Sequence, residues 1–427
     1  MPRRPHVSPE RAALVGLVTA SKRRLEAERS LGELAGLAAA ASATPVLRVL
    51  QERAKPDPAM FLGSGKVARL AASCAETDVD VVIFDNELTP AQLRQIEAQL
   101  DRKVIDRTQL ILDIFARRAR TREAKWQVEL AQLRYLLPRL VGAGVAMSRL
   151  GGGIGTRGPG ETKLETDRRR IRQRIGALSR AIDQVRDRRA HVRERRHKAS
   201  VPMVALVGYT NAGKTTLFNL LTREAAEVSD ALFVTLDPLV RRVRLPDRRE
   251  LLISDTVGFI DRLPHTLVAA FRATLEQVAG ADLLLHVVDA SNQDRDRQMD
   301  AVRRVLEEVG AAEVPAVEVF NKCDAIEPAE RRRLAEAEPS ALCMSALRGE
   351  GRGALLDAMA SRLALDTRRV TIEFDGTRVA DREQIAHLYR HAHVVRHEEH
   401  DGRVSIEADI PRRLIDRFIG RREEVEA

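Results

Sequence analysis

The sequence contains few aromatic residues and few cysteines. Aromatic residues make up 3% of its 427 residues, and only three cysteines occur, Cys74, Cys323 and Cys343. The cysteines lie far apart without CxxC spacing, which fits neither a disulfide framework nor a zinc site and leaves buried free thiols. No apolar run approaches the roughly 18–20 residues of a membrane-spanning helix, and the N-terminus shows no signal-peptide cleavage site. We therefore expect a cytoplasmic protein.

Positive charge, by contrast, is in excess. The 71 Lys and Arg residues outnumber 62 Asp and Glu, for a net charge of +9. Between Glu161 and Ser200 there are 14 basic residues against six acidic ones, so this segment holds most of the excess. Clustered charge favours a polyanionic partner. Because the segment has no aromatic residue, contact with phosphates is expected rather than base stacking. An ordinary solvated helix face is the alternative.

The order of patterns predicts a multidomain α/β protein in five parts. Residues 1–44 are Ala-rich and helix-prone, and residues 45–118 alternate strand and helix patterns, as in a small α/β domain. Residues 119–200 predict a basic helical hairpin with a glycine-rich tip. Residues 201–366 predict a P-loop domain with a mixed, mostly parallel sheet, and residues 367–427 a second small α/β module.

Three local expectations follow from the same patterns. The hairpin should comprise one helix from Thr108 to about Leu140 and another from Glu161 to about Lys198. The segment Gly63–Lys66 reads GSGK, but Met60 stands where GxxxxGK needs its first glycine, so a turn or helix start is expected. Half of the ten histidines lie in the last module without a carboxylate–histidine signature, so surface side chains are expected there rather than a metal site.

A phosphate-binding loop is predicted between a strand and a helix. The apolar run Val201–Val207 leads into GYTNAGKT at Gly208–Thr215, which matches GxxxxGK[ST] in the strand–loop–helix context that this motif requires. Glycines let backbone N–H groups converge on phosphates, and the helix N-terminus adds a positive field. We expect Lys214 to bridge the β- and γ-phosphates and Thr215 to bind Mg²⁺.

Two further segments are expected to sense the γ-phosphate. The strand Glu250–Ser254 ends in DTVG, in which Asp255 would bind Mg²⁺ through water and the Gly258 N–H would reach the γ-phosphate. Thr235, in the segment FVTLD between the two motifs, is the candidate switch threonine for Mg²⁺ and the γ-phosphate. Lys214, Thr235 and Gly258 are therefore the expected catalytic groups.

The segment NKCD at Asn321–Asp324 is expected to select guanine. The Asp324 carboxylate can accept hydrogen bonds from N1–H and the exocyclic amine of guanine, a donor pair that adenine lacks. Ser345 and Ala346, which follow the strand Ala341–Met344, would complete the pocket through backbone N–H groups. The expected contacts to GTP are Gly208, Tyr209, Thr210, Asn211, Ala212, Gly213, Lys214, Thr215, Thr216, Phe233, Val234, Thr235, Leu236, Asp237, Asp255, Thr256, Val257, Gly258, Asn321, Lys322, Cys323, Asp324, Ser345, Ala346 and Leu347.

One position departs from the hydrolytic template. The residue after DxxG is often a glutamine that orients the attacking water, and here it is Phe259, which cannot hydrogen-bond water. We expect slow intrinsic hydrolysis of GTP and a partner that accelerates it, which is the behaviour of a switch.

The glycine-rich linker and its continuation, GGGIGTRGPGETKLETDRRRI at 151–171, resemble the signature of the HflX family of translation-associated GTPases. GYTNAGKTTLFN, FVTLDP and DTVGFI are also similar to that family, and the resemblance covers about residues 45–366. Its members share the hydrophobic residue after DxxG. The resemblance implies a monomeric factor that binds the large ribosomal subunit and its RNA, with the hairpin near the peptidyl-transferase region, and separates stalled ribosomes. An additional ATP activity is associated with the N-terminal regions of some members.

The candidate RNA contacts lie at the tip and first turns of the hairpin. They are Arg157, Lys163, Arg168, Arg169 and Arg170. The residues themselves leave two alternatives open, a GTPase that acts on another RNA, such as pre-ribosomal or transfer RNA, and a switch directed at a protein or a membrane.

Overall fold

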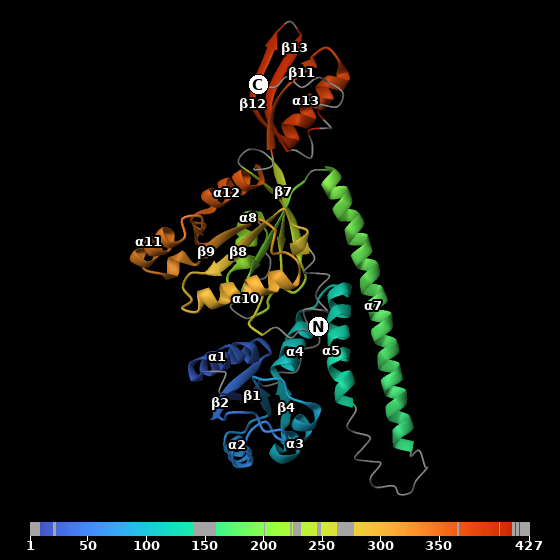
Figure 1. The fold of residues 1–427 in the computed structure, drawn as a ribbon, viewed down its shortest axis with the longest axis vertical. Helices are drawn as coiled ribbons and strands as arrows, with labels where there is room; N and C mark the ends of the chain where they lie inside the picture. The colour runs from blue at the N-terminus through green and yellow to red at the C-terminus, as the bar shows by residue number, and fades with distance from the viewer. Residues whose placement is uncertain are drawn as a thin grey trace, which may run out of the picture. The chain divides into compact units, whose positions relative to one another are not determined.

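The computed structural model (Figure 1) describes residues 9–19, 23–140, 159–199, 201–222, 224, 232–245, 249–262, 277–364, 367–400, 402–411, 415 and 418. The chain forms two compact units. The N-terminal unit comprises Met1–Val185, Ser229–Asp237 and Arg262–Phe271, and the C-terminal unit comprises Arg186–Val228, Pro238–Asp261 and Arg272–Ala427. The segment with the candidate switch threonine therefore belongs to the N-terminal unit, although the phosphate loop belongs to the C-terminal one.

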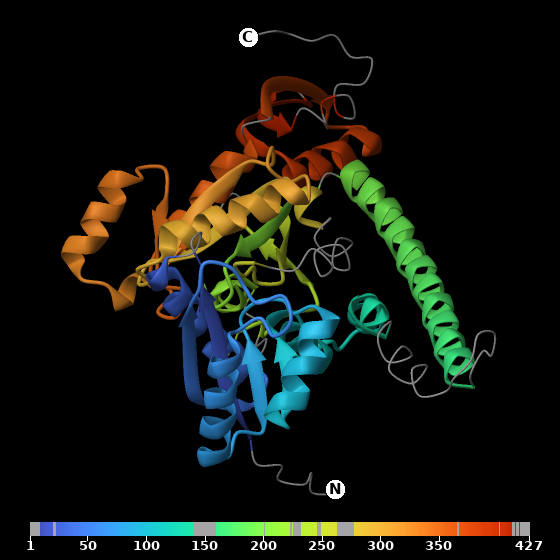
Figure 2. The same cartoon turned by 60° about the horizontal axis from the view of Figure 1, so that its bottom comes forward.

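The N-terminal unit contains a parallel four-stranded sheet with helices on both faces (Figure 2). Its strand order is β2-β1-β3-β4. The helices α2 and α3 bury one face of the sheet, around Val15 and Phe84, while α1 and α4 contact each other and the strands. The elements are β1 (Glu10–Val18), α1 (Arg24–Ala40), β2 (Ala43–Glu52), α2 (Ser64–Glu76), β3 (Val81–Phe84), α3 (Pro90–Leu100), β4 (Lys103–Asp106) and α4 (Arg107–Arg118).

Strand β1 shows that the prediction of a helix-prone segment at residues 1–44 was wrong for residues 10–18, whereas α1 confirms it for residues 24–40. Residues Ala12–Leu17 are all buried, since β1 lies between two strands and beneath helices. A strand covered on both faces carries a continuous apolar run without alternation, and periodicity cannot distinguish it from a buried helix. The alanine-rich composition of this segment favoured a helix, but packing between β2 and β3 makes residues 10–18 a strand. The GSGK segment is a helix start as expected, with Gly63 as the N-cap of α2.

The single helix expected from Thr108 to about Leu140 is two helices. Helix α4 ends at Arg118, and Ala119 leaves the helical conformation with ψ of 111°. Thr121 is the N-cap of α5 (Arg122–Arg139), and its hydroxyl accepts a hydrogen bond from the amide of Ala124 at 3.2 Å. The capping threonine is a local signal for this break.

Helix α7 (Pro159–Ala199) confirms the second long helix of the hairpin. Within the N-terminal unit it lies beside α5, because Arg174 donates to both carboxylate oxygens of Glu129, at 2.7 and 2.8 Å. Leu178 and Ile182 are buried on the same helix. The glycine-rich tip at residues 141–158 lies outside the described residues.

The C-terminal unit contains a six-stranded sheet in the order β10-β9-β8-β5-β7-β6, in which only β6 is antiparallel to its neighbour. Its core packs Leu206 and Val287 of the central strands against Phe218 of α8. The elements are β5 (Met203–Gly208), α8 (Lys214–Thr222), β6 (Leu239–Arg244), β7 (Glu250–Asp255), β8 (Leu283–Asp289), α10 (Arg295–Glu308), β9 (Ala316–Asn321), η2 (Cys323–Ala325), α11 (Pro328–Ala337), β10 (Leu342–Cys343) and α12 (Arg352–Ala364). The mixed, mostly parallel sheet is confirmed.

The chain continues into a three-stranded antiparallel sheet with one described helix. The order is β11-β13-β12, with β11 (Thr367–Asp375), α13 (Val379–His391), β12 (His393–His400) and β13 (Arg403–Pro411). Pro411 ends β13, and most residues that follow it lie outside the described part of the chain. Among the described residues no group of His, Cys, Asp and Glu could hold a metal ion. No helix in that same part of the chain could cross a membrane.

Candidate GTP-binding site

The phosphate loop has a backbone that only glycine allows at two positions. Gly208 has φ of +151° and Gly213 has φ of +92°. A Cβ atom added to Gly208 would lie 2.2 Å from the carbonyl oxygen of Val287, and one added to Gly213 would lie 2.2 Å from Nδ2 of Asn321. The loop between β5 and α8 is therefore packed against β8 at its start and against the end of β9 at its last glycine, which fixes its shape.

Lys214 and Thr215 begin α8 and turn their side chains toward the loop. The Lys214 ammonium donates to the carbonyl oxygens of Gly208 and Tyr209, at 3.0 and 2.8 Å. Burial lowers the pKa of Lys214 to about 8, and the nearby Asp255 opposes that shift. The Thr215 hydroxyl donates to Oδ2 of Asp255 at 2.8 Å. The structure thus brings together the three groups expected at the phosphates and the metal.

The DTVG segment pairs directly with the phosphate loop. The amide of Phe259 donates to the carbonyl of Gly208 at 3.1 Å, and the amide of Thr210 donates to the carbonyl of Phe259 at 2.7 Å. A Cβ atom at Gly258 would lie 2.8 Å from Cα of Thr210 and 3.0 Å from Nζ of Lys214. Gly258 therefore lies against the loop where the γ-phosphate was expected. The Phe259 side chain is buried, with 2% of its surface exposed.

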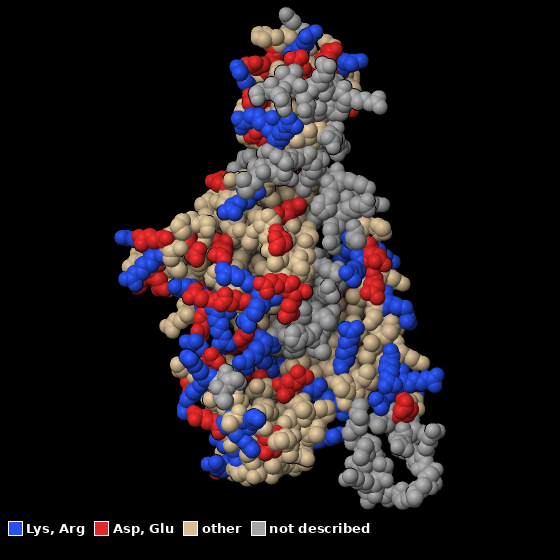
Figure 3. Space-filling model, in the orientation of Figure 1, with Lys and Arg blue, Asp and Glu red and all other residues tan. Residues whose placement is uncertain are grey.

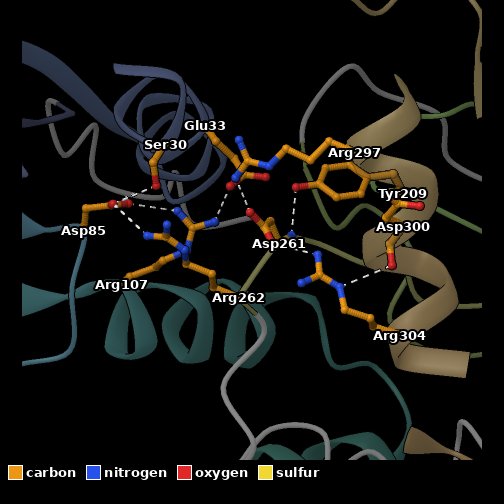
Figure 4. A network of polar contacts seen from close by, with 10 residues as sticks. All are labelled: Ser30, Glu33, Asp85, Arg107, Tyr209, Asp261, Arg262, Arg297, Asp300 and Arg304. Carbon is orange, nitrogen blue, oxygen red and sulfur yellow. Dashed lines mark hydrogen bonds and ion pairs between the residues drawn. The ribbon is translucent and has the colours of Figure 1, made fainter. Parts of the chain in front are cut away.

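Asp261, two residues after Phe259, makes a second link between the DTVG segment and the phosphate loop (Figure 4). The backbone amide of Asp261 donates to the Tyr209 hydroxyl at 2.7 Å. The Asp261 carboxylate pairs with Arg297 and lies 3.8 Å from Arg304, both on α10. This fixes the end of the segment to the C-terminal unit. This attachment has no local sequence signal, since its partners are distant along the chain.

Asp85 is the centre of a polar cluster in the N-terminal unit (Figure 4). Its carboxylate accepts hydrogen bonds from Ser30 at 2.6 Å and Arg107 at 3.1 Å, and the Arg262 guanidinium lies 3.6 Å away. Arg107 also pairs with Glu33. Asp85 follows β3, and a buried carboxylate needs such partners to stay ionised. The sequence analysis did not anticipate this cluster.

Asn321 links the base-binding segment to the phosphate loop. Its Nδ2 donates to the carbonyl of Ala212 at 2.9 Å, and its Oδ1 accepts from the amide of Ala346 at 2.9 Å. Lys322 has φ of +63°, and its ammonium pairs with Asp289 at 2.6 Å. Asp289 ends β8, and the sequence did not predict its ion pair with Lys322. An acidic residue at the end of an apolar strand was the available signal for a functional position.

Asp324 is held as a carboxylate acceptor. The Ser345 hydroxyl donates to it and, together with the smaller effects of Arg348 and Lys322, holds its pKa below the usual range. Asp324 and Ser345 thus lie together, as the prediction requires, and the ionised acceptor suits the two N–H donors of guanine. Leu347 is 80% exposed, so it has no packing partner that would restrict it.

The segment with the candidate switch threonine belongs to a different unit from the phosphate loop. Thr235 belongs to the N-terminal unit, so its place at Mg²⁺ and the γ-phosphate stays a prediction. Its neighbour Phe233 is buried edge-on against Phe115, with ring centroids 4.8 Å apart. The Asp237 carboxylate accepts from the amides of Arg120 and Thr121, at 2.9 and 3.1 Å, at the start of α5. The contact of Asp237 with GTP stays a prediction, and within the N-terminal unit its carboxylate holds the segment just before α5.

The candidate RNA contacts are described only in part. Arg157 lies outside the described residues, as does the side chain of Lys163. Arg169 and Arg170 are exposed on α7 and Arg168 is half-buried. Lys and Arg side chains line the described part of α7 (Figure 3), so the charge seen in the sequence lies on the helix surface.

Comparison with known proteins agrees with the geometry of the site. Three family models match the chain: "GTP-binding GTPase N-terminal" over residues 28–116, "GTP-binding GTPase Middle Region" over 118–196 and "50S ribosome-binding GTPase" over 203–322. Together with the phosphate loop, DTVG and NKCD, these matches define a P-loop GTPase, an enzyme that hydrolyses GTP.

Individual relatives identify the family of GTPases to which the chain belongs. GTPase HflX of Caldanaerobacter subterraneus subsp. tengcongensis is 50% identical over 74% of this chain and 73% of the relative. GTPase HflX of Escherichia coli (strain K12) is 45% identical over 85% of each chain. The chain belongs to the HflX family of GTPases. A crystal structure of a GTP-binding protein from Sulfolobus solfataricus with GDP is 23% identical, with a TM-score of 0.44, and covers 83% of this chain and 98% of that one.

Proposed function

We propose that this GTPase binds the large ribosomal subunit in its GTP form, leaves it after hydrolysis, and acts in translation by separating or rescuing stalled ribosomes or in the assembly of ribosomes. The basic surface of α7 carries the proposal, because it offers exposed arginines to a folded RNA. Support also comes from the family model described as a 50S ribosome-binding GTPase, which matches residues 203–322. The monomeric state and a cytoplasmic location belong to the same proposal.

Mg²⁺ is the cofactor that this proposal includes. The Thr215 hydroxyl and Asp255 carboxylate lie 2.8 Å apart, and oxygen donors of this kind are those that Mg²⁺ prefers. Thr215 would hold the ion directly, Asp255 would hold it through water, and Thr235 would join them in the GTP form. When bound, the ion neutralises charge on the β- and γ-phosphates. Lys214 and the amide of Gly258 orient the γ-phosphate.

Phe259 leads to a prediction about hydrolysis. Because Phe259 is buried and nonpolar, the residue after DTVG cannot position the attacking water. We expect the isolated protein to hydrolyse GTP at about the unassisted rate of small GTPases, on the order of 10⁻⁴–10⁻³ s⁻¹, and purified large subunits to accelerate it. Single-turnover assays with large subunits, small subunits and neither measure the effect. A fast intrinsic rate that ribosomal subunits leave unchanged would contradict the switch model.

The exposed arginines of α7 give a second prediction. Replacing Arg169 and Arg170 together by alanine should weaken cosedimentation with the large subunit in the presence of a non-hydrolysable GTP analogue. It should also lower the slope of log affinity against log salt by about 1 for each phosphate contact that is lost. GTP affinity should not change, since no side chain of the phosphate loop or NKCD lies on α7.

The matched control replaces Arg332 and Arg333, which are exposed on α11, and should leave subunit binding unchanged. Equal loss in both variants would show that net charge, and not the hairpin, governs binding. Retained binding by the α7 variant would refute the assigned interface. Binding to transfer RNA or precursor RNA in place of the subunit would favour a GTPase acting on another RNA, and binding to none of these would favour a switch directed at a protein or membrane.

A further inference from the structure

Two of the three cysteines meet beside the guanine-binding segment, although they lie apart in the sequence. In the β9–β10 pairing, Cys343 lies opposite Phe320. The turn η2 then brings Cys323 back over the end of β10, where its amide donates to the carbonyl of Met344 at 3.0 Å. Both cysteines pack in one apolar cluster with Phe320 and Leu334. The sequence analysis expected isolated thiols, and the fold pairs these two.

The two thiols belong to the same apolar cluster. Burial, followed by the Cys343 thiol, raises the pKa of Cys323 to about 12, while the Arg331 guanidinium opposes the shift. Cys323 also donates to the carbonyl of Phe320 at 3.2 Å. Both cysteines are free thiols. Two thiols in one cluster, on backbones joined by the hydrogen bond from the Cys323 amide to the Met344 carbonyl, need little movement to form a disulfide.

The two thiols differ in exposure. Cys323 is 3% exposed, so a solute cannot reach it directly. Cys343 is half-buried on the short edge strand β10 and is the one that a small oxidant meets first. This asymmetry suits a pair in which one cysteine reacts with the oxidant and the other resolves the product.

Cys323 lies between the two side chains that recognise the base. Lys322 precedes it and is held by Asp289 at 2.6 Å. Asp324 follows it and is held by Ser345. A disulfide requires a sulfur–sulfur distance of about 2.05 Å, shorter than any contact between free thiols. Closing that distance displaces the turn η2 relative to β10, and Lys322 and Asp324 flank the residue that moves.

We propose that Cys323 and Cys343 form a reversible disulfide that lowers the affinity of the protein for guanine nucleotides. The oxidant is a peroxide. Hydrogen peroxide converts the Cys343 thiol to a sulfenic acid and releases water, and the Cys323 thiol then displaces the hydroxyl as a second water while the S–S bond forms. A dithiol reverses the reaction. The effect on affinity rests on the guanine pocket proposed at Asp324, whereas bond formation does not.

The test treats the full-length protein with hydrogen peroxide and measures intact mass, free thiols and the affinity for a fluorescent GDP analogue. We expect the loss of two hydrogen atoms, a disulfide that links Cys323 and Cys343 in the peptide map, and an affinity at least about tenfold weaker, since two hydrogen-bonded groups move. Dithiothreitol should restore both. Bound GDP should slow the oxidation by holding η2 in place.

Two variants separate the explanations. Cys343→Ala should bind GDP normally and keep its affinity in peroxide, while Cys74→Ala, which removes the buried thiol of the N-terminal unit, should respond like the unmodified protein. No disulfide under conditions that oxidise a model dithiol overturns the proposal, as does a disulfide that leaves affinity unchanged. The pocket is tested separately, because its failure would appear as normal GDP affinity in reduced Asp324→Asn.

Discussion

Replacing Asp324 by asparagine should weaken the binding of GTP and GDP by at least about tenfold and shift the preference toward xanthine nucleotides. The carboxylate is ionised and held by Ser345, ready to accept from both N–H donors of guanine. The amide of asparagine offers one acceptor and places a donor against a donor. Each lost hydrogen bond to a charged group is worth about 1.5–3 kcal/mol. Xanthine carries an oxygen in place of the amine and accepts from that amide.

Calorimetric titration with GDP and xanthosine diphosphate measures this change. Glu330→Gln, on α11, makes the same carboxylate-to-amide change away from the pocket and should bind GDP normally. Unchanged GDP affinity in Asp324→Asn would show that the guanine pocket is not at NKCD.

Replacing Gly213 by alanine should have a larger effect, because it disturbs both halves of the nucleotide site. The new Cβ would lie 2.2 Å from Nδ2 of Asn321, and that atom donates to the carbonyl of Ala212. With φ of +92°, alanine is also strained by about 1–2 kcal/mol. Relieving the clash moves Asn321 away from Ala346 and the loop away from the phosphates. We expect GTP and GDP affinity to fall by at least about a hundredfold, or about 2.7 kcal/mol.

The control for this variant is Gly353→Ala in α12, where an added Cβ meets nothing within 4 Å. It should leave nucleotide affinity unchanged and leave the free energy of unfolding equal or higher, since alanine favours helix more than glycine does. Chemical denaturation and titration with GDP measure both quantities. Normal GDP affinity in Gly213→Ala would mean that the loop tolerates a side chain and that the described geometry does not govern binding.

Most of the GTP site was predictable because its motifs are local. The phosphate loop is a strand, a turn and a helix N-terminus in one continuous segment, so spacing and residue type specify its geometry. DTVG follows the adjacent strand β7, and parallel strands bring their carboxyl ends to one edge of the sheet. The placement of Lys214, Thr215 and Asp255 followed from these rules. The interactions that the sequence did not predict, such as Lys322 with Asp289, join residues that are distant along the chain.

The errors in the fold have a common physical origin. Strand β1 carries a continuous apolar run that suits a helix or a doubly covered strand, and only its neighbours β2 and β3 select the strand. The break between α4 and α5 separates two helices that both bury apolar side chains in the N-terminal unit. Helix or strand propensity is a weak signal for a buried apolar segment, because burial stabilises it in either conformation.

The sequence by itself determined that this protein binds and hydrolyses GTP, that guanine is the expected base, and that its excess positive charge lies on one helix, because each of these depends on residues adjacent along the chain. The tertiary structure alone decided which distant groups meet. In the folded chain Asp237 hydrogen-bonds the start of α5, and Cys323 and Cys343 pack in one cluster beside the proposed guanine pocket. Such contacts depend on strand order and register, which are set by how the whole core packs and leave no local pattern in the sequence.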